Sequence, residues 1–161
     1  MRAGIGFDVH AFDAARPLVL GGVTIPGSPG LAGHSDADVI GHAIADAVLG
    51  GANLGDLGSH FPDSDAQWKD ASSLDILRRV ASLVGDAGYT VESVDATVLL
   101  EAPKLAPHRD AMCANIADAL GISAGRVSVK ATTTEGLGTV GRGEGAACMA
   151  VALLGESDSL P

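Results

Sequence analysis

Asp8 and His10 stand two residues apart in a segment, residues 2–10, in which apolar and polar side chains alternate. Side chains two apart in a β-strand leave the same face, roughly 7 Å apart along the chain, so both could bind one metal ion. With His42 as a third ligand, one carboxylate and two histidines leave a fourth position open, which is typical of a catalytic zinc site. The alternative interpretation is a strand-end aspartate beside a histidine whose hydrogen bonds are satisfied within the fold.

His42 lies in the middle of a predicted helix, with Asp38 and Asp46 four residues to either side. Residues four apart lie on one face of a helix. A histidine that binds a metal commonly donates its other ring N–H to a carboxylate, which fixes the orientation of the ring. We therefore expect Asp38 or Asp46 to hold the outer nitrogen of His42.

A second polar group follows the strand-like segment 127–131. Thr132, Thr133, Thr134 and Glu135 offer hydroxyls, backbone N–H groups and a carboxylate at one point. Mg²⁺ takes one or two carboxylates and fills its remaining positions with phosphate oxygens and water, so this group predicts a site for phosphate and a hard cation. The alternative is a polar strand end in a turn, and the glycines around Arg142 could likewise be turn residues.

The acidic composition narrows the possible partners. The chain has 10 lysine and arginine residues against 20 aspartate and glutamate residues, a formal net charge of −10. Basic residues form no cluster that could neutralise a run of phosphates, so nucleic acid is excluded as a partner. No apolar run reaches the roughly 20 residues of a membrane helix, and residues 1–10 lack the layout of a secretion signal. We therefore expect a cytoplasmic protein that binds no membrane.

The two cysteines, Cys113 and Cys148, lie in apolar surroundings and form no Cys-x-x-Cys pair. Two cysteines cannot frame a domain of 161 residues. We expect buried free thiols, because cysteine is among the residue types most often buried.

Strand-like and helix-like segments alternate along the chain and predict the elements that position the candidate residues. We expect strands at residues 2–10, 18–20, 23–25, 91–101, 127–131 and 146–154, and helices at 35–48, 73–87 and 108–120. Ser35 is the expected N-cap of the first helix, residues 53–70 a long loop, and the tail from about residue 155 frayed. The pattern predicts one domain over residues 1–161. Its expected class is α+β, a two-layer sandwich whose mixed β-sheet carries helices on one face.

Several ordered motifs also resemble a known family. They are Gly6–His10, Gly33–Asp38 with His42, Phe61–Asp65, Ala102–Lys104 and Lys130–Glu135. In residue type and spacing this set resembles the 2-C-methyl-D-erythritol 2,4-cyclodiphosphate synthase family, over residues 4 to about 154. The resemblance implies a phosphorus–oxygen lyase of non-mevalonate isoprenoid (terpenoid) biosynthesis, which assembles as a homotrimer with active sites between subunits.

The resemblance also implies the reaction. The substrate would be 4-diphosphocytidyl-2-C-methyl-D-erythritol 2-phosphate, and the products the 2,4-cyclodiphosphate and CMP. The 2-phosphate would attack the β-phosphorus of the same molecule with the assistance of metal ions. Such a step requires positioning and charge neutralisation but no nucleophilic side chain.

Roles for individual residues come from the same resemblance. Asp8, His10 and His42 would bind one Zn²⁺ per subunit, and Glu135 would help to place Mg²⁺ or Mn²⁺ at the substrate diphosphate. His34 and Thr133 would donate to the charge that develops on the phosphoryl oxygens. The residues expected at the methylerythritol phosphate end are His34, Ser35, Asp56, Leu57, Gly58, Phe61, Pro62, Asp63, Ser64 and Asp65. Those expected at the cytidine, from a neighbouring subunit, are Leu100, Glu101, Ala102, Pro103, Lys104, Leu105, Ala106, Ala131, Thr132 and Thr133. The other residues expected to bind the substrate are Asp8, Val9, His10, Thr134, Glu135 and Arg142.

The sequence departs from the family pattern at two positions. Thr139 stands where many members have a phenylalanine that lines an apolar cavity on the trimer axis, and Gly136 replaces a commoner lysine. We therefore expect weak or absent binding of isoprenoid diphosphates along the axis. Glu144, two residues after Arg142, is expected to pair with it and temper its charge.

Two other classes of function use the same residue types. A zinc-dependent phosphatase or phosphodiesterase also employs aspartate and histidine with a divalent ion, but it consumes water. A noncatalytic zinc-binding or nucleotide-binding module would bind without turnover. The mass balance of the reaction separates these classes, because a cyclase releases CMP without consuming water.

Overall fold

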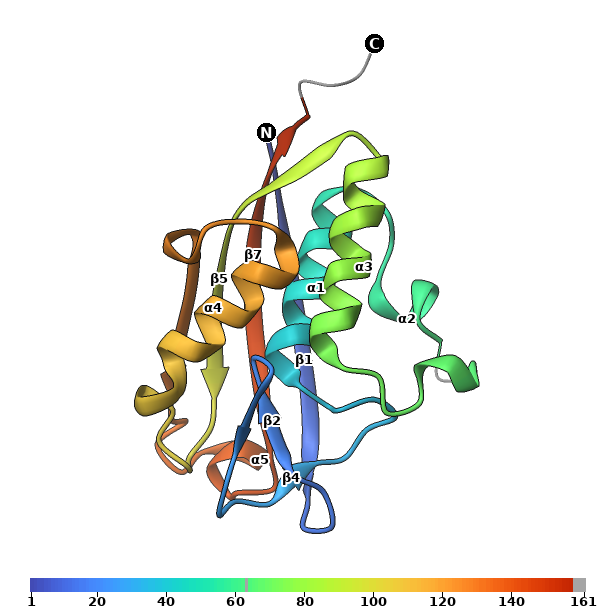
Figure 1. The fold of residues 1–161 in the computed structure, drawn as a ribbon. Coiled ribbons are helices and arrows are strands. Elements are labelled where there is room, and N and C mark those ends of the chain that lie inside the picture. Colours follow the sequence, from blue (N-terminus) through green and yellow to red (C-terminus); the bar gives the residue numbers. More distant parts are fainter. Residues whose placement is uncertain (63, 158–161) are drawn as a thin grey trace.

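A computed structural model of the chain describes residues 1–62 and 64–157, which form a five-stranded sheet with helices packed against it (Figure 1). The strand order is β4-β1-β7-β5-β6, and all neighbours are antiparallel except β5 and β6, which are parallel. The expected α+β class with a mixed sheet is confirmed, and the sheet is mostly antiparallel. The strands of this sheet are β1 (Arg2–Asp13), β4 (Gly30–Leu31), β5 (Tyr89–Leu99), β6 (Val127–Thr132) and β7 (Gly145–Glu156).

The remaining elements lie between these strands. The hairpin of β2 (Leu18–Leu20) and β3 (Val23–Ile25) turns at Gly21 and Gly22, which both have positive φ as a tight two-residue turn requires. The α-helices are α1 (Val39–Gly51), α2 (Leu57–His60), α3 (Ser73–Asp86), α4 (Arg109–Leu120) and α5 (Gly138–Gly141). Short 3₁₀ turns occur at η1 (Ala66–Trp68), η2 (Ala106–His108) and η3 (Ala124–Arg126).

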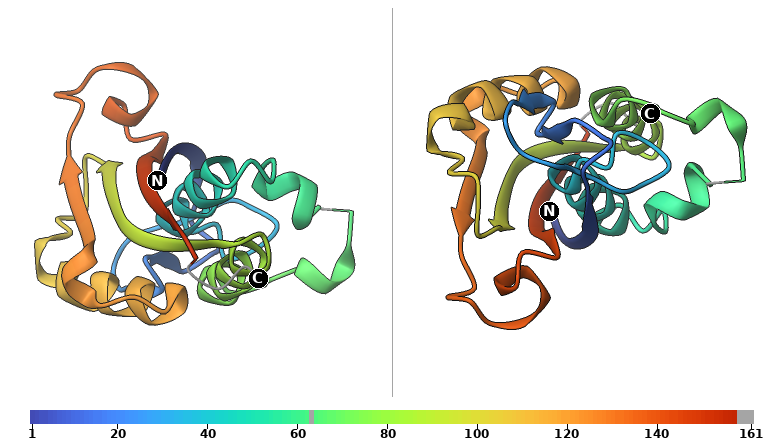
Figure 2. Two further views of the ribbon diagram at one scale, coloured as in Figure 1. Left: turned by 90° about the horizontal axis from the view of Figure 1, so that it is seen from above. Right: turned by 90° about the horizontal axis from the view of Figure 1, so that it is seen from below.

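The sheet has one covered face and one open face. Figure 2 shows α1, α3 and α4 together on one side of the strands. On β7 the residues that face these helices are all buried: Ala146, Cys148, Ala150, Ala152 and Leu154. On the opposite face Ile5, Phe7 and Val9 of β1 are 67%, 53% and 52% exposed, beside exposed Met149 and Val151 of β7. One chain therefore leaves an apolar sheet face in contact with solvent, which is a common mark of an interaction surface.

Two glycines allow α1 to lie directly on β1. A Cβ atom at Gly4 would meet the Ala47 carbonyl oxygen at 1.9 Å, and one at Gly6 would meet that of Ala43 at 2.0 Å. Any side chain at either position would therefore push the helix away from the strand. This close approach brings the first turns of α1 to the same height as Asp8 and His10, the next inward-facing residues of β1.

The expected start of the first helix is wrong. The helix begins at Val39, and its N-cap is Asp38, whose carboxylate accepts from the backbone N–H groups of Ile40 and Gly41. The Ser35 hydroxyl instead lies 3.0 Å from His42 Nε2. Both residue types favour N-cap positions, so sequence alone did not distinguish them.

Other corrections concern short elements and strand ends. Residues 53–70 are not a plain loop, because α2 and η1 lie within them, capped by the Asp56 and Asp65 carboxylates. Such short turns produce no periodic pattern for a sequence analysis to detect. β7 continues to Glu156, so residues 155 and 156 are ordered strand rather than a frayed tail; residues 158–161 lie outside the described part.

Both cysteines are free thiols, as expected. Cys148 is buried, and burial raises the pKa of its thiol well above the usual range. Cys113 is only partly buried, so the expected burial is confirmed for Cys148 and wrong for Cys113. None of the helices within residues 1–62 and 64–157 is long and apolar enough to cross a membrane.

Candidate active site

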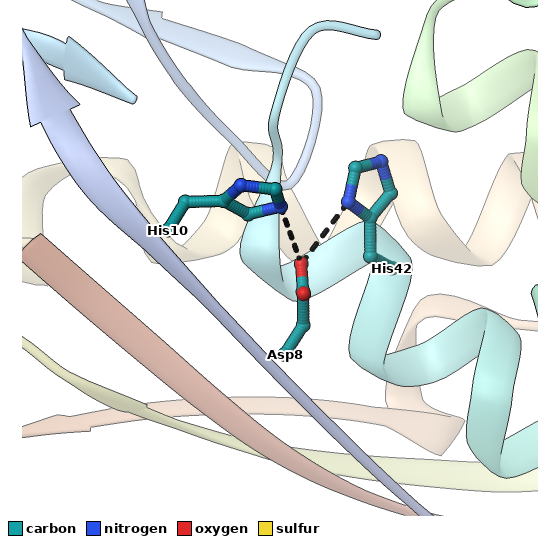
Figure 3. Close-up of side chains that lie close together, drawn as sticks. All are labelled: Asp8, His10 and His42. Carbon is teal, nitrogen blue, oxygen red and sulfur yellow. Dashed lines mark hydrogen bonds and ion pairs between the residues drawn. The ribbon is translucent and has the colours of Figure 1, made fainter. Parts of the chain in front are cut away.

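The structure brings Asp8, His10 and His42 together (Figure 3). Asp8 and His10 project from the helix-facing side of β1, and His42 projects from the start of α1. Asp8 Oδ2 lies 3.0 Å from His10 Nε2 and 3.0 Å from His42 Nδ1. One ligand atom from each residue lies within 4.8 Å of the other two. The three expected ligands thus meet at one point within a single chain.

The electrostatics of this cluster favour positive charge. Burial alone would raise the pKa of Asp8, but hydrogen bonds and charge interactions with His10 and His42 outweigh it and hold that pKa well below its usual range. Burial lowers the pKa of His42, but the hydrogen bond and the charge of Asp8 outweigh this effect and raise it. A cation placed among these atoms would meet an ionised carboxylate.

The donor set fits a zinc ion. Zinc binds histidine nitrogen and carboxylate oxygen at about 2.0–2.2 Å in a tetrahedron, which places neighbouring ligand atoms roughly 3.4 Å apart. The two 3.0 Å contacts of Asp8 are close to this spacing. Three protein ligands leave the fourth position for a substrate or a water molecule.

The outer nitrogen of His42 does not bind the expected partners. His42 Nε2 lies 3.0 Å from the Ser35 hydroxyl and 3.9 Å from Asp36 Oδ1. The prediction of Asp38 or Asp46 in this place is wrong. Ser35, which sequence reasoning assigned to substrate binding, also holds the histidine ring in its orientation.

Both rejected aspartates have other tasks. Asp38 is fully buried, and its carboxylate accepts from the backbone N–H groups of Gly21 and Gly22 and from the Ser73 hydroxyl as well as capping α1. Asp46 Oδ1 accepts from the Leu57 backbone N–H at 2.7 Å and so ties α2 to α1. Spacing along a helix indicates which residues share a face, but it cannot show which loops pack against that face.

The cluster opens into a cavity of about 210 Å³, here called the metal pocket. Its lining is Asp8, His10, Gly33, His34, Ser35, His42, Leu57, Phe61, Trp68 and Ile76. His34 lines this pocket, and its Nε2 atom is buried without a hydrogen-bond partner among the described residues.

Only some of the residues expected to bind the methylerythritol phosphate end line the metal pocket. His34, Ser35, Leu57 and Phe61 line the metal pocket. Asp56 caps α2, Gly58 lies within it, and Pro62, Ser64 and Asp65 lie in the adjoining segment before η1. Asp63 lies outside the described residues.

Sequence reasoning missed Gly33, Trp68 and Ile76 of the pocket lining. Trp68 packs edge-on against Phe61, with ring centroids 4.7 Å apart. Trp68 lies in a segment without helix or strand periodicity, so the sequence pattern did not indicate that it lines a pocket. Gly33 is required because a Cβ there would lie 2.9 Å from that of Ala37 and 3.2 Å from the His10 ring.

A second cavity of about 260 Å³, the nucleotide pocket, lies where β5 and β6 end. Its lining is Leu100, Glu101, Pro103, Lys104, Leu105, Ala106, Ala131, Thr132 and Thr133. The Glu101 carboxylate accepts from the Thr134 backbone N–H at 2.8 Å and from the Thr134 hydroxyl at 3.0 Å. These hydrogen bonds, the backbone one most of all, lower the pKa of Glu101. Glu135 follows with φ of +54°, and Thr133 donates to it at 3.1 Å. Nearly all of the segment predicted for cytidine thus gathers here.

One chain does not bring the two pockets together. Thr132 lies level with Leu99, Leu99 with Ala147, and Ala147 with Val9, so the pockets share one height along the strands. However, β7 and β5 lie between β1 and β6, a separation of roughly 14 Å at the spacing of neighbouring strands. Among the described residues, none lines both pockets.

The glycine-rich segment before β7 forms a third hollow of about 220 Å³, which Val9, His10, Ala11, Thr139, Val140, Glu144 and Gly145 line. Arg142 Nε donates to Glu144 Oε1 at 2.6 Å, so the expected pairing of these two residues is confirmed. Arg142 therefore does not line the nucleotide pocket of its own chain.

Comparison with known proteins places the chain in a family. The sequence profile of the YgbB family matches residues 1–155. The chain belongs to the YgbB family. A relative of this family from Salinibacter ruber, named 2-C-methyl-D-erythritol 2,4-cyclodiphosphate synthase, is 63% identical over 150 residues, which are 93% of this chain and 96% of the relative.

Solved structures of YgbB-like chains share the fold. The bifunctional IspDF of Campylobacter jejuni superposes with a TM-score of 0.93 at 43% identity; the match covers 98% of this chain and 42% of that longer chain. The IspF of Plasmodium falciparum, solved as a CDP complex, superposes with a TM-score of 0.83 at 33% identity, covering 98% of this chain and 97% of the other. The resemblance found in the separate sequence motifs is thus confirmed over the whole domain.

Proposed function

We propose that this chain converts 4-diphosphocytidyl-2-C-methyl-D-erythritol 2-phosphate into 2-C-methyl-D-erythritol 2,4-cyclodiphosphate and CMP. The carrying observation is the convergence of Asp8, His10 and His42 at the mouth of a cavity, in a chain 63% identical to a relative that bears the synthase name. The activity serves non-mevalonate isoprenoid biosynthesis.

In the metal pocket, Asp8, His10 and His42 would hold Zn²⁺, which would supply Lewis-acid polarisation of a substrate phosphate oxygen. The buried His34 Nε2, which lacks a partner among the described residues, donates to a phosphoryl oxygen of the substrate. Ser35 keeps the His42 ring in place. The apolar side of the pocket, formed by Leu57, Phe61 and Trp68, excludes water from the reacting phosphates.

The reaction needs positioning more than a reactive side chain. An oxygen of the 2-phosphate forms a bond to the β-phosphorus, and the bond from the β-phosphorus to the oxygen of CMP breaks. Both groups belong to one bound molecule, so the protein's task is to fold that molecule back in line. Thr133 donates to the phosphoryl oxygens, and Glu135 would hold Mg²⁺ or Mn²⁺, which would supply charge neutralisation at the diphosphate. A chain of formal net charge −10 needs such cations to offset phosphate repulsion.

The two pockets become one active site in a homotrimer. Within one chain, roughly 14 Å of sheet separates the two pockets. For one substrate to occupy both, the nucleotide pocket of one chain faces the metal pocket of its neighbour. The exposed apolar face of Ile5, Phe7, Val9, Met149 and Val151 supplies the contact between subunits. A cytoplasmic location and the single-domain organisation over residues 1–161 remain predictions.

Turnover of the cytidyl substrate, followed by phosphorus NMR in ¹⁸O-enriched water, tests the proposal. We expect CMP and the cyclic diphosphate in equal amounts, with no ¹⁸O in either product. A zinc-dependent phosphatase or phosphodiesterase would place ¹⁸O on phosphorus. Saturable binding of CMP without turnover would instead identify a noncatalytic nucleotide-binding module. Either result would overturn the proposed function.

A further inference from the structure

Arg16 lies outside the metal pocket but holds the loop that forms one of its walls. It stands between β1 and β2, and its guanidinium Nη1 donates to the Gly33 carbonyl while Nη2 donates to the Ser35 carbonyl. These two carbonyls flank His34. Among the described residues, no carboxylate forms an ion pair with Arg16, so its charge is directed at this loop.

The same loop has further anchors, and Arg16 completes them. The His34 carbonyl accepts from the Asp70 backbone N–H at 3.0 Å, and the Asp36 backbone N–H donates to the Ala71 carbonyl at 3.2 Å. Three consecutive carbonyls, from Gly33 to Ser35, are therefore all bonded, and Arg16 supplies the donors for two of them. Arg16 therefore holds the Gly33–His34 peptide group and, together with the bond from the Asp36 N–H to Ala71, the Ser35–Asp36 peptide group.

The loop carries two groups that act on the metal pocket. His34 presents a buried Nε2 atom, and the Ser35 hydroxyl lies 3.0 Å from His42 Nε2. A planar guanidinium with two parallel donors can bind two carbonyls at fixed separation, whereas the ammonium of lysine is a single point. A charge-assisted hydrogen bond is also about twice as strong as a neutral one.

We infer that Arg16 is a positioning residue for His34 and Ser35. The inference rests on the proposed function, because the aligned groups are those assigned to the phosphoryl oxygens and to His42. Arg16 contacts none of the three metal ligands by hydrogen bond or ion pair among the described residues, so zinc binding should survive its loss. Turnover should not, since displacement of a catalytic group by about 1 Å can lower a rate roughly 100-fold.

The surroundings of Arg16 permit a direct test by chemical rescue. Beside it lies a hollow of about 420 Å³ that Ala15, Arg16, Pro17, Val19, Asp36 and Asp70 line. Truncation to alanine would extend this hollow to the Gly33 and Ser35 carbonyls. A free guanidinium ion could then enter and donate to both carbonyls in place of the missing side chain.

The experiment compares wild type, Arg16→Ala, Arg16→Lys and the control Arg78→Ala, each loaded with zinc. Arg78 is a half-exposed arginine on α3 that pairs with Asp75 and Asp118, far along the chain from the loop. We expect Arg16→Ala to keep its zinc and to lose about 100-fold in kcat, with a smaller change in KM, because the nucleotide pocket is intact. Guanidinium chloride, well below unfolding concentrations, should restore part of the lost kcat in this variant and leave Arg78→Ala unchanged.

Wild-type kcat in zinc-loaded Arg16→Ala, or a folded Arg16→Ala that guanidinium does not rescue, would overturn the inference. If Arg16→Ala does not fold, Arg16→Lys decides: a kcat reduced at least tenfold supports the guanidinium fork, and a wild-type kcat refutes it. An inactive wild-type protein would refute the proposed function instead, so the two failures are distinguishable.

Discussion

The metal pocket and the nucleotide pocket differ in how much of each one chain completes. The ligands of the metal pocket converge from β1 and α1, and His42 is only 6% exposed. The nucleotide pocket lies at the open ends of β5 and β6, where Thr132, Thr133 and Glu135 are exposed and held mainly by short-range hydrogen bonds. The contrast indicates that a single chain preorganises the proposed metal-binding half of the site, whereas in the proposed trimer a second subunit would oppose the nucleotide pocket.

The largest effect should come from the buried half. His42→Ala removes one of the three proposed metal ligands, and we expect the purified variant to lose both zinc and detectable turnover. Metal analysis beside a turnover assay measures both. The control is His60→Ala, because His60 lies on α2 and bonds to the Leu54 carbonyl outside the cluster. Equal zinc in wild type and His42→Ala would remove His42 from the ligand set.

A substitution at exposed Glu135, beside the nucleotide pocket, should affect turnover without affecting zinc content. Glu135→Gln keeps the shape of the side chain but weakens the hold on the second cation, so we expect turnover to fall about 100-fold to 1,000-fold while zinc content stays at the wild-type level. Glu92→Gln, at a distant exposed carboxylate paired with Arg126, serves as the matched control. Full activity of Glu135→Gln at low Mg²⁺ would exclude Glu135 from the mechanism.

The pH dependence of protein stability should reveal the charge interaction between Asp8 and His42 in the metal pocket. In zinc-free protein the lowered pKa of Asp8 stabilises the fold above its ordinary value of 3.8, and this contribution is lost as pH falls through the lowered value. The raised pKa of His42 stabilises the fold below its ordinary value of 6.5, and this contribution is lost as pH rises through the raised value. We therefore expect the Asp8–His42 pair to contribute most between about pH 4 and 6.5.

Thermal unfolding measures this effect. The Tm of chelated protein should fall between pH 6 and 9, by roughly 2–4 °C for each kcal/mol lost in a chain of this length. Asp8→Asn should abolish the part of this fall that comes from the pair. Zinc-loaded protein should show the reverse trend in metal affinity, because zinc must displace the proton on His42 and binds more tightly as pH rises. Identical pH profiles for chelated wild type and Asp8→Asn would contradict this description.

The smallest effect concerns the hollow that Thr139 lines beside exposed Val9. We expect weak or no binding of farnesyl diphosphate by the natural protein, since threonine offers little apolar surface and Arg142 is already paired with Glu144. Thr139→Phe should increase binding, because burial of a phenylalanine-sized side chain contributes about 1.5–3 kcal/mol. Calorimetric titration of both proteins decides the question. Tight binding by the natural protein, or no gain in Thr139→Phe, would refute it.

Local pattern predicted the parts of the site that lie within one element. The alternation of β1 placed Asp8 and His10 on one face, and the strand-like segment 127–131 placed Thr132–Glu135 at a strand end. Partnerships between distant segments were not accessible in this way. The close packing of α1 on Gly4 and Gly6 decides that His42 reaches Asp8, and nothing in the periodicity of α1 shows it.

The side chains that hold the loops were the least predictable. Asp38 and Ser35 are both good N-cap residues, and tertiary contacts with Ser73 and His42 determine which one takes that position. Arg16 lies in a turn-rich segment with no recognisable motif. It bonds to Gly33 and Ser35, which are 17 and 19 residues further along the chain, and helix or strand periodicity does not predict contacts between such distant segments. Such side chains become visible only when the two segments they join are placed in space.

A mixture of His42→Ala and Glu135→Ala subunits tests the shared active site most directly. Each variant alone should be inactive. When equal amounts are co-expressed and assemble at random into symmetric trimers, about one quarter of the sites combine an intact metal pocket with an intact neighbouring nucleotide pocket. We therefore expect about one quarter of wild-type activity from the whole co-expressed population, homotrimers included. Mixed oligomers as inactive as their parents, or a monomer by light scattering, would contradict an active site built from two chains.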